Sequence, residues 1–283
     1  MFSNQAVTKK FCLVFCMVSS SFFIPFGLSY AATHKEQKIE KIKMRGEFNV
    51  CSSSGFIPFD MKNNKGEWLG FDFFMMKAFA EHLGVQKLNM SDINFDGIIP
   101  ALVAGKCDMI AAGMTVTEER KKVLLFSETV YLNGLSAAVK LTETNKTHYK
   151  TIEQLNNKSL KIAVKTGYTS DIYATKHLKN AHLMRFDQDP DLINAVIQGK
   201  ADAFITDSSY LKPAVSEYKN KLYVIKEEIP GEPIAVAAHK NDKNLIEEFN
   251  RFFANWKKNG GYDKAFSSAF ITQEWRNNVV HKK

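Results

Sequence analysis

Apolar and polar positions alternate along this chain in blocks that predict strands and helices in turn. Short apolar runs predict strands at residues 48–53, 108–112, 159–164 and 203–206. Asp72–Leu83 and Leu245–Asn259 instead repeat their apolar residues at helical spacing, and the second pattern ends at a Gly-Gly stop. Strands that alternate with helices indicate an α/β fold with parallel sheets.

Weaker patterns fill most of the remaining chain. Helices are predicted near 98–104, 117–122, 168–178 and 189–198, and strands at 224–225 and 234–238. The stretch Thr142–Thr151 is polar and is predicted to be a loop. On the first long helix, Phe73, Met76, Phe79 and Ala80 share one face, which indicates core packing.

Length and composition indicate an ordinary globular protein. The chain has 283 residues, of which 45% are hydrophobic and 24% charged, so it can bury one large core or the cores of two lobes. Its formal charge of +8 comes from scattered basic residues. Because these form no stripe with interleaved aromatic residues, we expect no nucleic-acid partner.

The first residues read as a targeting segment. A basic pair at 9–10 precedes the apolar stretch Phe11–Phe26, and small residues follow at 29–31. Serines and a proline interrupt the apolar stretch, which argues against an uncleaved membrane anchor. We predict a signal peptide at 1–31, cleaved after Ala31 or Ala32, and a periplasmic protein.

Two of the four cysteines, Cys51 and Cys107, lie outside this leader. Both fall in or beside predicted strands. If the C-terminal ends of two neighbouring parallel strands align, Cys51 lies beside Ala111, several residues from Cys107. That offset exceeds the roughly 7 Å between Cα atoms that a disulfide tolerates. We therefore expect two buried free thiols.

The densest chemical signal is the segment Gly113–Arg120, which follows the strand at 108–112. Gly113 lets a ligand approach the backbone closely, because no Cβ is in the way. The hydroxyl of Thr115 and the free amides at a helix start can donate to an anion. Arg120 adds a planar fork that pairs with a carboxylate through two hydrogen bonds. The alternative is a capped surface helix with a solvated arginine.

Signs of an enzyme are absent from the sequence. His177 and His182 lie five residues apart, which suits no common metal-binding pair on a helix. No nucleophile elbow, phosphate-binding loop or Cys-His constellation is found. We expect a protein that is not an enzyme and that uses no metal, no cofactor and no catalytic residue.

The segment Gly113–Ser127 resembles the signature of the bacterial extracytoplasmic solute-binding proteins of family 3, which deliver polar amino acids to ABC importers. Further motifs resemble the same family in the same order: Phe56-Ile57-Pro58-Phe59, Gly70-Phe71-Asp72, Phe95-Asp96-Gly97-Ile98-Ile99-Pro100-Ala101-Leu102, Ala163-Val164-Lys165-Thr166-Gly167 and Ala201-Asp202-Ala203-Phe204-Ile205-Thr206-Asp207. The resemblance covers roughly residues 46–270.

This resemblance implies an architecture and partners. The fold would be the type II periplasmic-binding-protein fold, two α/β lobes joined by two hinge crossings. One lobe would comprise 46–131 plus 236–270 and the other 136–230, with hinges at 132–135 and 231–235. The protein would bind a free polar or basic amino acid in the cleft as a monomer. A membrane permease of an ABC importer would then receive the ligand.

The resemblance also implies ligand-binding roles for eight residues. Arg120, with the backbone amides of Thr115 and Thr169, would hold the α-carboxylate. Asp207, with the Gly113 carbonyl and the Thr115 hydroxyl, would hold the α-ammonium. Phe56 and Phe95 would be the two aromatic walls around the ligand side chain, and Lys165 would reach that side chain. The alternatives are a plain helix cap for Asp207, plain core packing for Phe56 and Phe95, and a solvated turn position for Lys165.

One position departs from the family pattern. Many members carry an aspartate three residues before the first aromatic wall, where this chain has Ser53. Its loss weakens the case for a strongly cationic ligand, although Asp96 or Glu232 could compensate. It also leaves open an enzymatic alternative on the same fold, a periplasmic cyclohexadienyl (prephenate or arogenate) dehydratase.

Overall fold

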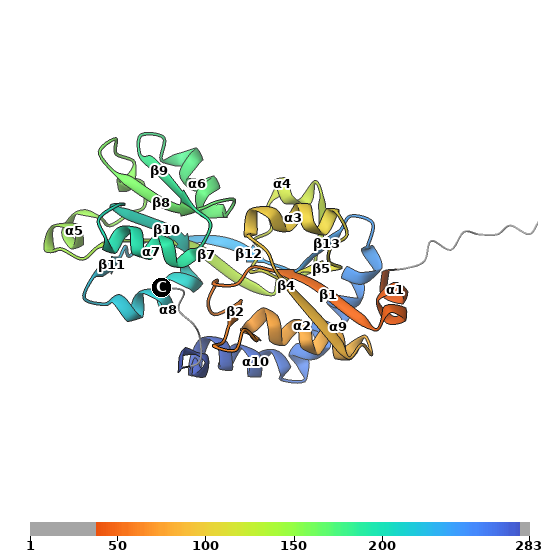
Figure 1. Cartoon of the computed structure of the whole chain (residues 1–283). Helices are drawn as coiled ribbons and strands as arrows, with labels where there is room; N and C mark the ends of the chain where they lie inside the picture. The colour runs from red at the N-terminus through yellow and green to blue at the C-terminus, as the bar shows by residue number, and fades with distance from the viewer. Residues whose placement is uncertain (1–37, 278–283) are drawn as a thin grey trace, which may run out of the picture. The chain divides into compact units, whose positions relative to one another are not determined.

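The computed structural model describes residues 38–277, and most of its strands gather into two sheets (Figure 1). The predicted signal peptide at 1–31 lies outside these residues. In spatial order, the strands of the five-stranded sheet are β4 (Lys87–Asp92), β1 (Glu47–Ser52), β5 (Met109–Ile110), β13 (Ala237–His239) and β6 (Leu124–Phe126). β1 pairs in parallel with β4 and β5, whereas β13 pairs antiparallel with β5 and β6.

Helices cover both faces of this sheet, which explains why its strands are rich in buried apolar residues. They are α1 (Lys38–Arg45), α2 (Phe71–His82), α3 (Phe95–Val103), α9 (Lys243–Lys258) and α10 (Gly261–Phe266). Figure 1 shows α3 on one side and α2, α9 and α10 on the other. As predicted, Met76, Phe79 and Ala80 of α2 are buried, while Phe73 is half-buried. We call this sheet with its helices the first lobe.

The second sheet has six strands. They are β11 (Leu222–Val224), β7 (Tyr131–Lys140), β10 (Ala203–Asp207), β8 (Lys161–Lys165) and β9 (His182–Phe186), with β12 (Ile229–Ile234) paired to β7. β8 pairs in parallel with β9 and β10, and β7 is antiparallel to its three partners. We call this sheet the second lobe, together with the helices α5 (Glu143–His148), α6 (Thr169–His177), α7 (Asp189–Ile197) and α8 (Ser208–Val215).

Two long strands, β7 and β12, carry the chain into and out of the second lobe. They pair antiparallel with each other from Tyr131 and Ile234 onwards, with an irregularity between Pro230 and Glu232. At their first-lobe end, the amide of Val130 donates to the carbonyl of Ile234 at 2.8 Å. These two strands therefore connect the two sheets.

The remaining short elements extend both lobes. α4 (Glu118–Lys121) precedes β6, and β2 (Met61–Lys62) pairs with β3 (Trp68–Leu69) in a separate hairpin. Four single turns complete the chain: Glu153–Leu155, Ser216–Tyr218, Ser267–Thr272 and Glu274–Asn277. Within residues 38–277, no helix is both long enough and apolar enough to span a bilayer.

Two local predictions were wrong. The polar stretch Thr142–Thr151 contains the helix α5, because the Thr142 hydroxyl accepts a hydrogen bond from the Asn145 amide at 3.0 Å and caps the first turn. The apolar run at 234–238 is not one strand. β12 ends at Ile234 and β13 begins at Ala237, since the Ala235 amide bonds to Met114 instead.

The prediction of two free thiols was also wrong: Cys51 and Cys107 form a disulfide, with their Cα atoms 5.7 Å apart. The register places Cys51 opposite Ile110, close to the predicted partner. However, Cys107 does not continue the line of β5, since the strand begins only at Met109. The chain bends before the strand, so that counting residues along an extended strand overestimated the separation.

Candidate functional site

The first-lobe part of the candidate site follows β5. Gly113 has φ +55°, and its amide donates to Oδ2 of Asp72 at 2.8 Å. A Cβ added at Gly113 would lie 2.2 Å from the ring of Phe56. Only glycine fits here, because the backbone is left-handed and an aromatic ring packs directly on it.

Arg120 is held in a defined position although it is charged. Its own amide donates to the Thr117 hydroxyl at 3.2 Å, the cap of α4. Its guanidinium donates from Nη1 to the Thr115 carbonyl at 2.7 Å and from Nη2 to the Gly167 carbonyl at 3.0 Å. Gly167 belongs to the second lobe, and Arg120 is only 7% exposed. The surface-helix alternative is therefore wrong: Arg120 is a buried cation between the two lobes.

The second-lobe part lies at the ends of β8 and β10. Asp207 is the last residue of β10, is 3% exposed, and accepts a hydrogen bond from Nδ2 of Asn133 at 2.5 Å. It occupies the N-cap position of α8 without making a side-chain cap hydrogen bond. The plain-cap alternative therefore fails. Thr169 is 7% exposed and begins α6, so its amide lies at a helix N-terminus.

Lys165 proves to be a buried ion-pair partner, 1% exposed, at the end of β8. Its ammonium lies 2.5 Å from Oδ2 of Asp189 and donates to the Tyr168 hydroxyl at 2.8 Å. Burial raises the pKa of Asp189, while the Lys165 ammonium opposes that rise. Lys165 therefore anchors Tyr168 and α7 to the sheet.

Aromatic rings join the two lobes. Phe56 is 1% exposed and Phe95 6% exposed, so both predicted walls are buried. Phe56 stacks on Phe59 at 5.1 Å and on Tyr210 at 6.0 Å between ring centroids. Tyr168 contacts both walls, with its centroid 4.3 Å from that of Phe95 and 5.8 Å from that of Phe56. The guanidinium of Arg120 lies 5.2 Å from the centroid of Phe95.

Of the eight residues predicted from the sequence, Phe56, Phe95 and Arg120 contact the second lobe. Gly113 and Thr115 contact members of this group from the first lobe, and Lys165, Thr169 and Asp207 belong to the second lobe. Sequence reasoning missed Tyr168, Tyr210, Asn133 and Asp189, which contact members of that set. Tyr168 and Tyr210 could have been found, because they stand close to Thr169 and Asp207 in the sequence. The other two come from elements distant in the sequence and carry no motif.

Two further acids lie beneath the aromatic rings of the first lobe. Asp60 and Asp72 are at most 1% exposed, and they accept hydrogen bonds from the Ser52 hydroxyl at 2.6 Å and the Gly113 amide at 2.8 Å, respectively. Burial raises the pKa of Asp72 to about 6. Burial, followed by the charge of Asp72, raises the pKa of Asp60 well above its usual range. The site therefore disfavours two ionised carboxylates at once.

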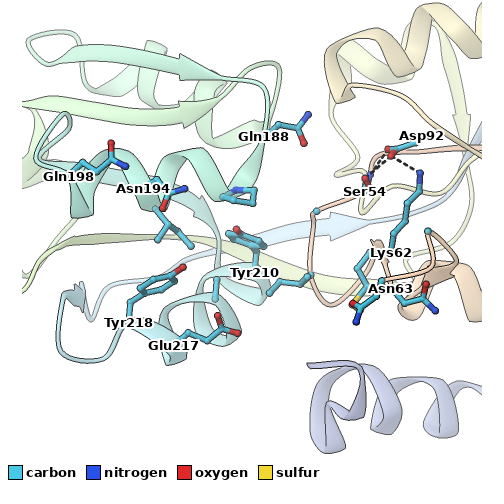
Figure 2. A pocket seen from close by; sticks show the side chains of 18 residues that line it. Ser54, Lys62, Asn63, Asp92, Gln188, Asn194, Gln198, Tyr210, Glu217 and Tyr218 are labelled. Carbon is cyan, nitrogen blue, oxygen red and sulfur yellow. Dashed lines mark hydrogen bonds and ion pairs between the residues drawn. The ribbon is translucent and has the colours of Figure 1, made fainter. Parts of the chain in front are cut away.

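A cavity of about 680 Å³ opens beside this cluster (Figure 2). Its first-lobe side includes Ser54, Lys62 and Asp92, which are joined by hydrogen bonds and an ion pair. Its second-lobe side includes Asn194 and Tyr210. None of the eight predicted ligand residues lines it, but Tyr210, which does, stacks on Phe56. The predicted site is thus a packed cluster next to this cavity.

Acidic, histidine and cysteine side chains do not gather in threes anywhere within 38–277 in a way that could hold a metal ion. The charged groups of the cluster are Arg120 and Lys165 on one hand and Asp189 and Asp207 on the other. Such a set can pair with a zwitterion, one end at each lobe.

Solved structures define the class of protein that this fold represents. A mutant of ArgBP from T. maritima matches with a TM-score of 0.77 and 34% identity, over 83% of this chain and 99% of that one. The ancestral amino acid-binding protein AncCDT-1, described as a precursor of cyclohexadienyl dehydratase, matches with a TM-score of 0.76 and 34% identity, over 83% of this chain and all (100%) of the other. The fold is that of a type II periplasmic binding protein with two α/β lobes, as the sequence indicated.

The family follows from the sequence comparison. The model of the bacterial extracellular solute-binding proteins, family 3, matches residues 48–272, and the chain belongs to that family. A characterised relative is the L-cystine-binding protein TcyJ of Escherichia coli (strain K12), 25% identical over 234 residues, which are 83% of this chain and 86% of the relative. The family and these relatives are binding proteins, as predicted.

Proposed function

We propose that this protein captures a free amino acid between its lobes and delivers it to the membrane permease of an ABC importer. The observation that carries the proposal is the buried Arg120, which lies between the lobes with hydrogen bonds to Thr115 and Gly167. A planar guanidinium can pair with a carboxylate through two hydrogen bonds, so a ligand α-carboxylate is the natural partner for this buried cation.

The opposite end of the ligand would bind Asp207. This carboxylate is buried at the end of β10, where α/β sheets bind their ligands. It would hold the α-ammonium together with Gly113 and Thr115, and the Thr169 amide would complete the carboxylate site. Phe56 and Phe95 would flank the ligand side chain. Lys165 is paired with Asp189, so in this proposal it supports the site from behind and does not reach the ligand.

Closure of the lobes would trap the ligand. We propose the boundaries 46–131 plus 236–270 for one lobe and 136–230 for the other, with hinges at 132–135 and 231–235. The hinge segments fall in β7 and at the end of β12. A ligand shifts the equilibrium towards closure only through contacts that it gains there, and those would be the second-lobe groups Asp207 and Thr169.

The compartment follows from the same function. After removal of residues 1–31, the protein would act in the periplasm as a monomer, and the permease would recognise its closed form. Relatives such as TcyJ are named for the amino acid that they bind.

The decisive experiment replaces Arg120 by Ala and measures amino-acid binding by titration calorimetry. We expect a loss of about 3–5 kcal/mol, since the ligand carboxylate would be left unpaired in a dry cleft. That is at least a hundredfold in affinity. Arg251→Ala is the matched control, because Arg251 is exposed and pairs only with Glu248.

A chemical probe separates direct contact from loss of fold. The wild type should bind the amino acid far more tightly than its α-carboxamide, whereas Arg120→Ala should bind the two about equally. A loss under tenfold, or a variant that still discriminates against the amide, would mean that Arg120 does not bind the carboxylate.

One alternative function retains a specific observation in its favour. AncCDT-1 is described as a precursor of cyclohexadienyl dehydratase and matches all (100%) of its length to this chain. A dehydratase would need a cleft acid, and burial raises the pKa of the Asp60 carboxyl well above its usual range. Incubation with prephenate or arogenate tests this alternative: release of phenylpyruvate or phenylalanine would establish it in place of simple binding.

A further inference from the structure

Tyr168 stands between the two aromatic walls of the site. Its ring makes edge contacts with Phe95 at 4.3 Å and with Phe56 at 5.8 Å between centroids, while no ring contact within residues 38–277 joins the two walls directly. The ring is 4% exposed. A side chain of the protein thus already occupies part of the space that a ligand side chain would enter.

The ring is fixed from the second lobe. The Lys165 ammonium donates to the Tyr168 hydroxyl at 2.8 Å and lies 4.3 Å from the centroid of its ring. Lys165 is in turn held by Asp189 at 2.5 Å, and both are at most 1% exposed. Because the buried ion pair cannot move without separating its charges, Tyr168 has little freedom to swing aside.

Charge balance limits the ligand further. Asp207 would be neutralised by the α-ammonium, and Asp189 is neutralised by Lys165. Asp60 and Asp72 are at most 1% exposed and accept hydrogen bonds from Ser52 and Gly113. Ser53 is buried and uncharged, and Asp96 is exposed. Among these described residues, none is a buried carboxylate left for a cationic ligand side chain, whose burial would be costly in a dry site.

We propose that Tyr168 is the specificity-determining residue of this cleft, and that it restricts the ligand to amino acids with a short, uncharged side chain. This inference rests on the proposed amino-acid binding. It separates the chain from ArgBP of T. maritima, which has been solved with arginine bound. In this chain the restriction comes from the ring of Tyr168 and from the internally paired Lys165, and both belong to the second lobe.

The test compares size and charge separately. Purified protein is freed of bound ligand in guanidinium chloride, refolded, and titrated with glycine, L-alanine, L-serine, L-glutamine, L-lysine, L-arginine and L-cystine. The wild type should prefer one of the first three by at least tenfold. Tyr168→Thr removes the ring and should raise the affinity for glutamine at least tenfold, while lysine and arginine gain less because no carboxylate is added.

Two further variants serve as controls. Tyr168→Phe keeps the ring and should keep the preference for short side chains. Tyr173→Thr removes the same phenol from the same helix, α6, outside the cluster, where Tyr173 stacks on His177. It should leave all affinities within threefold. Circular dichroism verifies that each variant is folded.

The results of these titrations show whether the inference about Tyr168 fails or the proposed function itself fails. If the wild type binds arginine, lysine, glutamine or cystine most tightly, the inference is wrong and amino-acid binding stands. The same holds if folded Tyr168→Thr gains nothing for glutamine. If neither the wild type nor any variant binds an amino acid, the proposed function itself fails.

Discussion

The two lobes each bury a pair of ionisable side chains beside the cleft, and they balance the charge differently. In the second lobe, Lys165 and Asp189 form an ion pair. In the first lobe, Asp60 and Asp72 are two neighbouring acids, and burial raises the pKa of both carboxyls. All four side chains are at most 1% exposed. The charges of the ion pair therefore cancel, whereas two ionised carboxylates in the acid pair would repel each other.

Because of this difference, we expect the two buried pairs to have different roles in the cleft. The ion pair holds the Lys165 ammonium against the Tyr168 hydroxyl, so it can fix Tyr168 in the cleft. The acid pair lies under Gly113, whose amide donates to Asp72. It thereby ties the first-lobe ligand loop to α2 through a carboxylate that responds to pH. We therefore expect the buried pair of the first lobe to change its charge with pH, and the ion pair of the second lobe to serve as a fixed support.

Breaking the ion pair should have the largest effect. Lys165→Met leaves the Asp189 carboxylate buried without its partner, and we expect unfolding in urea to lose about 3–5 kcal/mol. Lys212→Met is the matched control in the same lobe, because Lys212 and Glu228 form an exposed pair, which contributes little.

A double variant tests the reason for that loss. Lys165→Met combined with Asp189→Leu removes both charges and should recover most of the stability. If the single variant loses less than about 1 kcal/mol, or the double variant is no more stable than the single one, the buried pair is not what we describe.

Removing the disulfide should lower the free energy of unfolding somewhat less than breaking the ion pair does, and the loss should fall on the first lobe. The bond between Cys51 and Cys107 closes a loop over a sequence separation of 56. Loss of such a cross-link typically lowers stability by about 2–4 kcal/mol. In C51A/C107A, amide hydrogen exchange should accelerate in β1 and β5 and stay unchanged in β8 and β10. Equal acceleration in both lobes would contradict an effect confined to the first.

The disulfide also shows which part of the fold could not be predicted from the sequence. Periodicity predicted β1 and the neighbourhood of Cys51 within one residue of the true register. It could not predict the bend before Met109, because that bend depends on how α3 returns to the sheet. Element types were therefore predictable, whereas a contact between irregular backbone and a strand was not.

The candidate site likewise contains positions that local sequence patterns can indicate and contacts that they cannot. Gly113, Arg120 and Asp207 could be predicted because each stands at a strand end or helix start, where local pattern fixes position. Lys165 was assigned to the ligand, yet its partner Asp189 lies 24 residues further on. The parallel pairing of β8 with β9 brings the two together. A tertiary contact of this kind leaves no trace in a local motif.

The acid pair should give the smallest effect, visible as a pH dependence. The folded pKa of Asp72, about 6, exceeds the ordinary value of 3.8. A raised pKa stabilises the folded state fully below the unfolded value, and this stabilisation is lost as pH rises through the folded value. The free energy of unfolding should therefore fall by about 2 kcal/mol between pH 4 and pH 7 through Asp72 alone. The raised pKa of Asp60 adds to this fall, because the folded state keeps a proton that the unfolded chain has already lost.

Asp60→Asn distinguishes the two acids, because it keeps the size of the side chain but carries no titratable proton. The fall caused by Asp72 should remain, since burial is the main cause of its raised pKa. The fall caused by Asp60 should disappear, so the free energy of unfolding should change less steeply with pH in the variant than in the wild type. Urea unfolding across pH 4–9 measures both curves. A variant whose curve parallels the wild type throughout would show that the pKa of Asp60 is not raised by folding, and the contrast between the lobes would then rest on Asp72 alone.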